Sequence, residues 1–132
     1  MRRRIGQARV GRLATTNAAG QPHIVPVCFV LEGDEIVTAV DRKPKSTFDL
    51  KRVANVRANP RVSMIVDQYD EDWDQLWWVR VDGRARVLQP GPGYEEAIAP
   101  LYDKYRGQYG LHGLPGPALV IEANRWVGWS AR

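Results

Sequence analysis

An eleven-residue alternation in the second half of the chain constrains the fold more than any other feature. From residue 77 to residue 87, apolar or small residues at odd positions alternate with Trp78 and charged residues at even positions. Successive side chains of a strand point to opposite faces, so the pattern predicts one long strand with a buried face. Trp77 follows the inward register and is expected to fill a barrel, whereas Trp78 faces outward. Gly83 lies on the inward face and predicts the bend or bulge that barrels need.

Shorter strands are predicted on both sides of this long one. Turn-rich segments separate apolar runs at 13–16, 23–31, 35–40 and 62–67, and the last strand or two cover 118–123 and 126–129. Helical spacing of apolar residues predicts helices at about 46–58 and 92–106. Five or six strands with helices inserted between them favour a mainly β fold, an antiparallel barrel with helical inserts. At 132 residues, the chain 1–132 is expected to form a single domain.

The predicted strand at 23–31 is apolar on both faces, which indicates cover on both sides by core, ligand or a partner subunit. Pro26 lacks a backbone donor and predicts an edge strand or a bulge at that point. Cys28, the single cysteine, is expected to be a buried and inert thiol. Trp73, within the acidic segment 70–74, is expected to anchor that loop.

Positive charge gathers before and along the first predicted helix. Residues 1–60 hold 11 Lys and Arg against 5 Asp and Glu, a net charge of +6, while residues 61–132 hold 8 against 10, a net charge of −2. Ser46 and Asp49 form a capping-box-like pair, and Lys43 and Lys45 come just before it. Unpaired N–H groups at a helix start attract anions, so this turn predicts a phosphate site. A solvated basic helix face is the alternative.

Several classes of function are disfavoured by what the chain contains. The basic segment 42–61 has one aromatic residue, Phe48, whereas nucleic-acid readers interleave basic and exposed aromatic residues. Two histidines away from ligand spacing and no nucleophile–base pair argue against a metal site and a catalytic side chain. Hydride-transfer enzymes need neither, because the cofactor carries the chemistry. Without an apolar run of roughly 20 residues, we expect a soluble, cytoplasmic protein that binds no membrane.

Five segments in this order resemble one family. They are RLATTNAAGQPHIVPVCF, TAVDRKPKS, NVRANPRVSMIVD, WWVRVDGRARVL and VIEANRWVGW. Together they resemble the pyridoxamine 5'-phosphate oxidase-like split β-barrel superfamily, in particular the branch that uses the deazaflavin coenzyme F420. The resemblance implies a six-stranded antiparallel split β-barrel of the FMN-binding type with two to three helices. It also implies a homodimer with cofactor sites in the grooves between subunits.

The same resemblance assigns roles to individual residues. It implies that part of the strand at 23–27 and the end of the next strand line the cofactor ring, that the basic turn holds the phosphate, and that cations of the helix meet the acidic tail. Arg125 and Trp129 would reach the partner subunit's site. The implied cofactor-binding residues are His23, Val25, Pro26, Val27, Thr38, Lys43, Lys45, Ser46, Lys51, Arg52, Arg57 and Trp129. No catalytic or metal-binding residue is implied.

We therefore expect an F420-dependent oxidoreductase that passes hydride from the reduced deazaflavin to a small unsaturated organic substrate. An FMN-binding oxidase or reductase of the same fold is one alternative. FMN carries no acidic tail, so the extra cations Lys51, Arg52 and Arg57 favour the deazaflavin. A non-catalytic module that binds a cofactor or haem is the other alternative.

Overall fold

One curved antiparallel sheet dominates the computed structural model, which describes residues 1–40, 47–108 and 116–132, with the backbone alone for 47–50. The sheet has seven strands in the order β2-β1-β5-β6-β7-β4-β3. Their bounds are β1 Gly11–Thr16, β2 Pro22–Val27, β3 Val30–Glu32, β4 Glu35–Ala39, β5 Arg61–Gln68, β6 Trp77–Leu88 and β7 Ala118–Ser130. The predicted mainly β barrel with helical inserts is confirmed, with seven strands in place of six.

The extra strand arises because the segment predicted as one strand at 23–31 is interrupted at Cys28 and Phe29. Thr38 Oγ1 donates to the Cys28 carbonyl at 2.6 Å. The Phe29 N–H donates to Tyr105 Oη at 3.2 Å, and the Phe29 carbonyl accepts from Lys104 Nζ at 2.8 Å. Side chains therefore replace the ladder partners of these two residues, and the strand splits into β2 and β3. Cys28 is exposed at this break, so its predicted burial is wrong.

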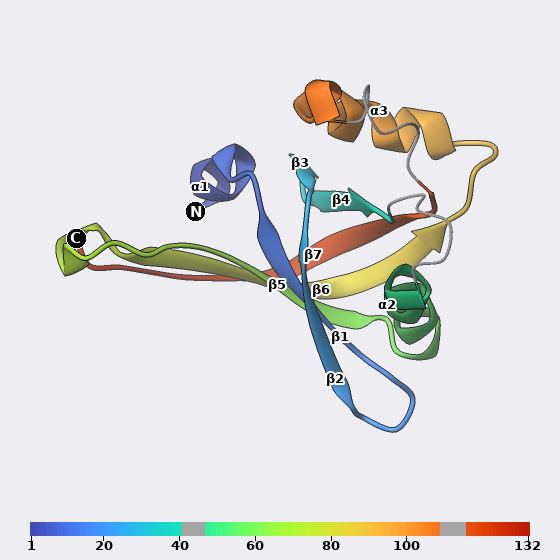
Figure 1. Ribbon diagram of the computed structural model, residues 1–132, viewed down its shortest axis with the longest axis horizontal. Helices are drawn as coiled ribbons and strands as arrows, with labels where there is room; N and C mark the ends of the chain where they lie inside the picture. The colour runs from blue at the N-terminus through green and yellow to red at the C-terminus, as the bar shows by residue number, and fades with distance from the viewer. Residues whose placement is uncertain (41–46, 109–115) are drawn as a thin grey trace.

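The helices of the described chain lie around the sheet (Figure 1). They are α1 Arg2–Gln7, α2 Thr47–Ala58 and α3 Tyr94–Lys104, and a 3₁₀ turn, η1, covers Trp73–Gln75. The two predicted helices at 46–58 and 92–106 correspond to α2 and α3, whereas α1 was not predicted from the sequence. None of the described helices is long and apolar enough to cross a bilayer.

Apolar side chains form two clusters on opposite faces of the sheet. The larger one joins Ile5 of α1 and Val53 and Val56 of α2 to the inward residues of the strands, including Met64 and Val81. The smaller one lies under α3. It contains Val37, Ala39, Tyr94, Ile98, Leu101, Tyr105, Ala118 and Val120. Helix α3 covers only one end of the sheet face that carries the smaller cluster. No other helix of the described chain lies on that face, since α1 and α2 pack against the larger cluster.

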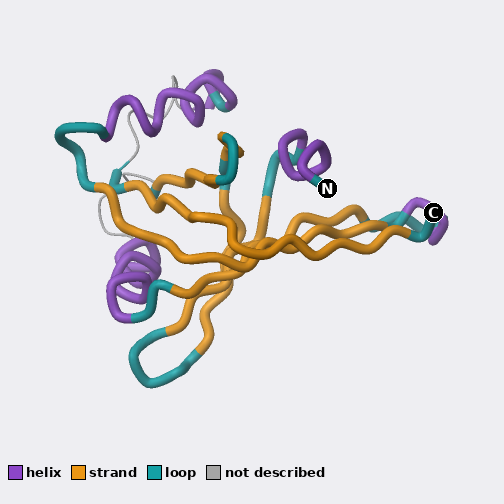
Figure 2. Tube along the Cα trace, turned by 180° about the vertical axis from the view of Figure 1, so that it is seen from behind, coloured by secondary structure: helices purple, strands orange, loops and turns teal. Residues whose placement is uncertain are grey.

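The ends of β5, β6 and β7 extend beyond the body as a twisted arm that carries the C-terminus at its tip (Figure 2). Arg2 stacks over Trp126 at 4.7 Å and Arg4 over Trp77 at 4.8 Å, so α1 braces the arm from one side. Trp77 also packs against the larger cluster, as its register predicts. Trp73 at the tip is 68% exposed, so the expectation that it anchors the acidic loop is wrong.

Gly83 lies at a register shift between β6 and β7, as predicted for a bulge. A Cβ atom placed there would lie 2.2 Å from the Glu122 carbonyl oxygen, which no side chain tolerates. Glycine thus permits the close backbone approach at which the long strand bends.

Candidate functional site

A polar group lies where α2 covers the strands β1 and β2. We call this group, formed by Thr15, His23, Lys51, Arg52 and Asn55, the α2 corner. Thr15 and His23 are directly opposite one another in the register of β1 and β2, so their side chains share the face that α2 covers. Asn55 Nδ2 donates to Thr15 Oγ1 at 3.0 Å, and both residues are buried. This bond fixes the inner part of the helix against β1.

His23 is the unusual member of the α2 corner. Its Nδ1 atom is buried and has no hydrogen-bond partner among the described residues, whereas buried polar atoms are nearly always paired. Burial lowers the pKa of His23 below that of a free imidazole, and the charges of Lys51 and then Arg52 lower it further. The imidazole is therefore neutral at physiological pH, with one ring nitrogen that still needs a partner.

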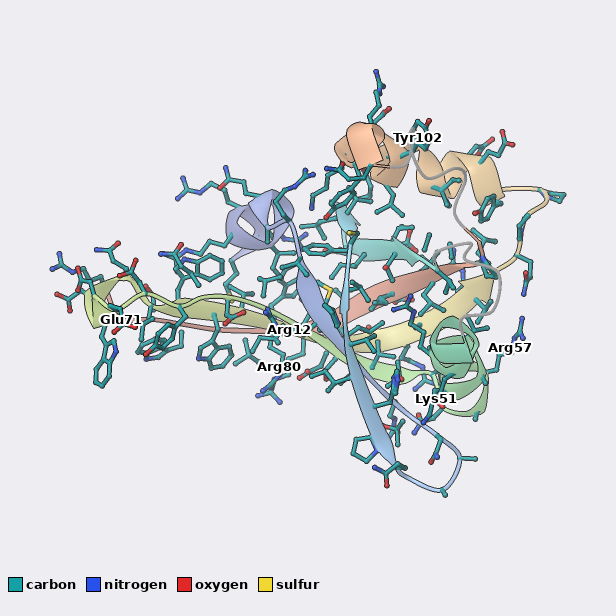
Figure 3. The ribbon with its side chains drawn as sticks, in the orientation of Figure 1. Arg12, Lys51, Arg57, Glu71, Arg80 and Tyr102 are labelled. Atoms are coloured by element: carbon teal, nitrogen blue, oxygen red, sulfur yellow. The ribbon has the colours of Figure 1, made fainter. Side chains whose placement is uncertain are left out.

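Lys51 lies exposed at the outer side of the same helix, whereas the Arg52 side chain is buried. Figure 3 shows that Lys51 and Arg57 both come from α2, well apart from Arg12 and Arg80 in the middle of the sheet. A neutral imidazole beside two cations can bind a polar, negatively charged molecule, because the cations attract it and the ring nitrogen orients it.

A second polar region lies on the face of the sheet opposite to α2, around a hollow of about 410 Å³. Charged and amide side chains line much of it. Its lining residues are Ala14, Thr16, Arg61, Val62, Ser63, Asp82, Gly83, Arg84 and Asn124. Asp82 accepts hydrogen bonds from Ser63 Oγ at 2.8 Å and Arg80 Nε at 2.9 Å, and these bonds lower its pKa against the effect of burial. The Asp82 carboxylate therefore stays ionised, and the ion pair with Arg80 compensates its negative charge.

Comparison with known proteins decides the family. The model of the family described as pyridoxamine 5'-phosphate oxidase matches residues 1–128. The chain belongs to this family. In sequence, the chain is similar to the 5a,11a-dehydrotetracycline/5a,11a-dehydrooxytetracycline reductase of Streptomyces rimosus, with 35% identity over 82 residues. That match covers 61% of this chain and 56% of the reductase, so the chain spans little more than half of the relative's length.

Solved structures share the fold of this chain. A conserved hypothetical protein of Mycobacterium tuberculosis has a TM-score of 0.75 at 23% identity, covering 98% of this chain and 82% of its own. An FAD-binding protein of Mesorhizobium loti has a TM-score of 0.75 at 24% identity, with coverages of 96% and 87%. The haem-storage protein HutZ of Vibrio cholerae has a TM-score of 0.70 at 17% identity, with coverages of 94% and 87%. At these identities the similarity shows the fold alone.

Within this family fold, β2 divides its predicted cofactor-binding residues between two faces. His23, Val25 and Val27 point toward α2 and the larger cluster, and Val27 is 5% exposed. Pro26 is exposed on the opposite face, on an edge strand as its missing donor predicts. The alternation of a strand makes it impossible for these side chains to line one surface together.

The other predicted residues are spread over the molecule. His23, Lys51 and Arg52 come together, whereas Arg57 is exposed near the end of α2 and Trp129 is 48% exposed on the arm. Thr38 is buried, with its hydroxyl bonded to the Cys28 carbonyl. Lys43, Lys45 and Ser46 lie outside the described residues. The cofactor-binding roles of these residues stay predictions.

Sequence reasoning missed Thr15 and Asn55 at the α2 corner and the pairing of Arg61 with Arg84 at the hollow. A signal for Asn55 was present, because it is a polar residue between Val53 and Val56 on the apolar side of the helix. Arg61 and Arg84 carried no such signal, since only the register of β5 and β6 makes them neighbours.

Proposed function

We propose that this chain is an F420-dependent oxidoreductase that passes hydride from the reduced deazaflavin to a small unsaturated organic substrate. The observation that carries the proposal is the buried Nδ1 atom of His23, which has no partner in the described part of the chain and lies beside Lys51 and Arg52. The reductase of Streptomyces rimosus supports an oxidoreductase activity. The cofactor and the substrate class are inferred from the chemistry of the residues and from the family resemblance.

The residues at the α2 corner fit a polar, anionic cofactor. Lys51 and Arg52 supply positive charge for acidic groups, and His23 offers one hydrogen bond through Nδ1 to a polar edge of the ring. Strand β2 pairs with β1 alone among the described strands, so its outer edge keeps backbone N–H and C=O groups for the same purpose. Pro26 removes one donor from this edge.

Each group of the protein has a positioning role in this proposal. When bound, the reduced deazaflavin supplies the hydride. His23 stays neutral because its pKa is lowered, so it orients the bound molecule without adding a third positive charge. Val25 packs against the apolar cluster beneath β2 and keeps the strand rigid. Such rigidity would hold a bound cofactor in one orientation.

We also propose that the active form is a homodimer. The face of the sheet that α3 leaves uncovered carries Ile24, which is 64% exposed, and Trp129, which lies opposite the half-buried Trp78. Exposed aliphatic and aromatic side chains on one face are typical of subunit interfaces. Sedimentation velocity should therefore show a dimer that Ile24→Asp converts to monomer. A monomeric parent at tens of micromolar would contradict the proposed assembly.

The test is a titration of the protein with F420 and with FMN at low and moderate salt, followed by tryptophan fluorescence. We expect salt-sensitive binding of F420 with FMN much weaker. Lys51→Gln should weaken F420 binding about tenfold or more, because a hydrogen bond to a charged group contributes roughly 1.5 to 3 kcal/mol. His23→Leu should weaken it about twofold to tenfold, because a hydrogen bond between neutral groups contributes roughly 0.5 to 1.5 kcal/mol. Lys43→Ala with Lys45→Ala should weaken it further if the basic turn holds the phosphate.

Arg106→Gln is the matched control, because Arg106 is exposed just after the end of α3 and pairs with Asp103, three residues earlier. It should leave F420 binding unchanged. Preference for FMN would assign the chain to the oxidase alternative. Binding of neither flavin would leave the non-catalytic cofactor or haem-binding module.

A further inference from the structure

We infer that the hollow bordered by Arg61 and Arg84 is an oxyanion-binding site for a carboxylate or phosphate group. The two arginines are directly opposite one another on β5 and β6, and both side chains are exposed. Like charges in directly opposed positions of a sheet destabilise it. Among the described residues, neither guanidinium makes an ion pair or a side-chain hydrogen bond, so no direct contact in that part of the chain offsets the repulsion.

The other groups around the hollow agree with an anion. Asn124 is the residue that the bulge leaves without a partner on β6, and its amide makes no hydrogen bond within the described chain. Asp82 is held by Ser63 and Arg80 and does not turn toward Arg84. Glu122 lies opposite Arg84 on β7, yet no ion pair joins the two. Two guanidinium groups and one amide thus face a space of about 410 Å³ that accommodates a small anion.

The hollow is separate from the α2 corner. Ala14 and Thr16, which line the hollow, alternate along β1 with Thr15, which faces α2. The sheet therefore separates the two sites, and the inference does not depend on which cofactor binds beside His23. The anion could be free in solution or an acidic group of a larger molecule, since both present the same oxygen atoms to the arginines.

The test is isothermal titration of the protein, without any flavin, with inorganic phosphate and with a triglutamate peptide at constant ionic strength. A variant with Lys43→Gln and Lys45→Gln is used in parallel to remove any contribution of the basic turn. We expect saturable binding that survives in this variant and weakens at least tenfold when Arg61→Gln and Arg84→Gln are added. Tighter binding of triglutamate than of phosphate would indicate an acidic chain, and the reverse a small anion.

Arg86→Gln is the matched control, because Arg86 lies on the same strand, two residues from Arg84, and pairs with Glu35 at 3.6 Å. It should change binding less than twofold. The unliganded R61Q/R84Q protein should melt no lower than the parent, since the repulsion is gone. Equal losses for R86Q and R61Q/R84Q, or no saturable binding by the parent, would overturn the inference. Phosphate binding that persists without any F420 binding would instead contradict only the proposed function.

Discussion

Polar side chains meet the sheet at the end of α3 and at the α2 corner. The two contacts differ in how many of their polar atoms have hydrogen-bond partners. At the end of α3, Lys104 Nζ donates to the Ala8 carbonyl at 2.7 Å and to the Phe29 carbonyl at 2.8 Å. Tyr105 Oη lies 2.9 Å from the Arg9 carbonyl and accepts from the Phe29 N–H. At the α2 corner, His23 Nδ1 is buried, and no described residue bonds it.

The difference separates a structural contact from a binding contact. The α3 contact joins three distant segments of the chain, and Lys104 also lies 4.2 Å from the centre of the Phe29 ring. Each polar atom there has a partner within the chain, so a ligand would gain nothing by binding. The α2 corner keeps one unsatisfied nitrogen beside two cations, an arrangement that a bound molecule would relieve.

The largest effect on stability should come from Gly83, because its backbone lies against that of Glu122 where the register of β6 and β7 shifts. Gly83→Ala would force the backbone of Glu122 away and should lower the free energy of unfolding by about 3 kcal/mol. Urea denaturation of the variant and the parent measures this difference in the free energy of unfolding. Gly6→Ala is the control, since a Cβ atom there meets nothing within 4 Å. Equal stability of G83A and the parent would contradict the bulge's role.

A smaller loss should follow from Lys104→Met, which keeps the side chain's length and removes the ammonium group. The Ala8 and Phe29 carbonyls lose a charged donor, so stability should fall by about 1.5 to 3 kcal/mol. Denaturant unfolding measures the change. A loss below about 0.5 kcal/mol would show that water satisfies these carbonyls and that the α3 contact is not structural.

His23→Leu should have nearly no effect on stability, within about 1 kcal/mol of the parent in either direction. The substitution removes an unpaired buried polar atom and fills the same space with apolar groups. The same variant should lose cofactor affinity, so stability and binding respond separately. A marked destabilisation with unchanged binding would make the α2 corner a structural contact like that of α3.

The smallest effects are expected from pH. Burial lowers the pKa of Lys104 to about 8, with a further contribution from the charge of Arg9. Because the unfolded chain keeps its proton up to higher pH, stability should rise as pH increases from about 8 toward 9.5, and K104M should lose this rise. His23 also has a lowered pKa, so stability should fall as pH drops below about 6.5, and H23L should reduce that fall. Denaturation curves at half-unit pH steps test both signs, and slopes that persist in the variants would exclude these groups.

Local pattern was enough to predict the architecture. The alternation at 77–87, the two helical segments and the glycine bend all depend on neighbouring residues, whose spacing fixes which face each side chain takes. The family resemblance followed from the order of short segments. The positive charge of α2 was also predicted, because the charge of a Lys or Arg side chain follows from the residue type alone.

The tertiary structure decided which distant groups meet. Phe29 lost its ladder partners to Lys104 and Tyr105, which lie about 75 residues away in the chain, so one predicted strand became two and Cys28 became exposed. Only packing brings His23 against α2, where no described residue bonds its Nδ1 atom. Only strand register places Arg61 opposite Arg84. Such contacts join residues far apart along the chain, and no local periodicity records them.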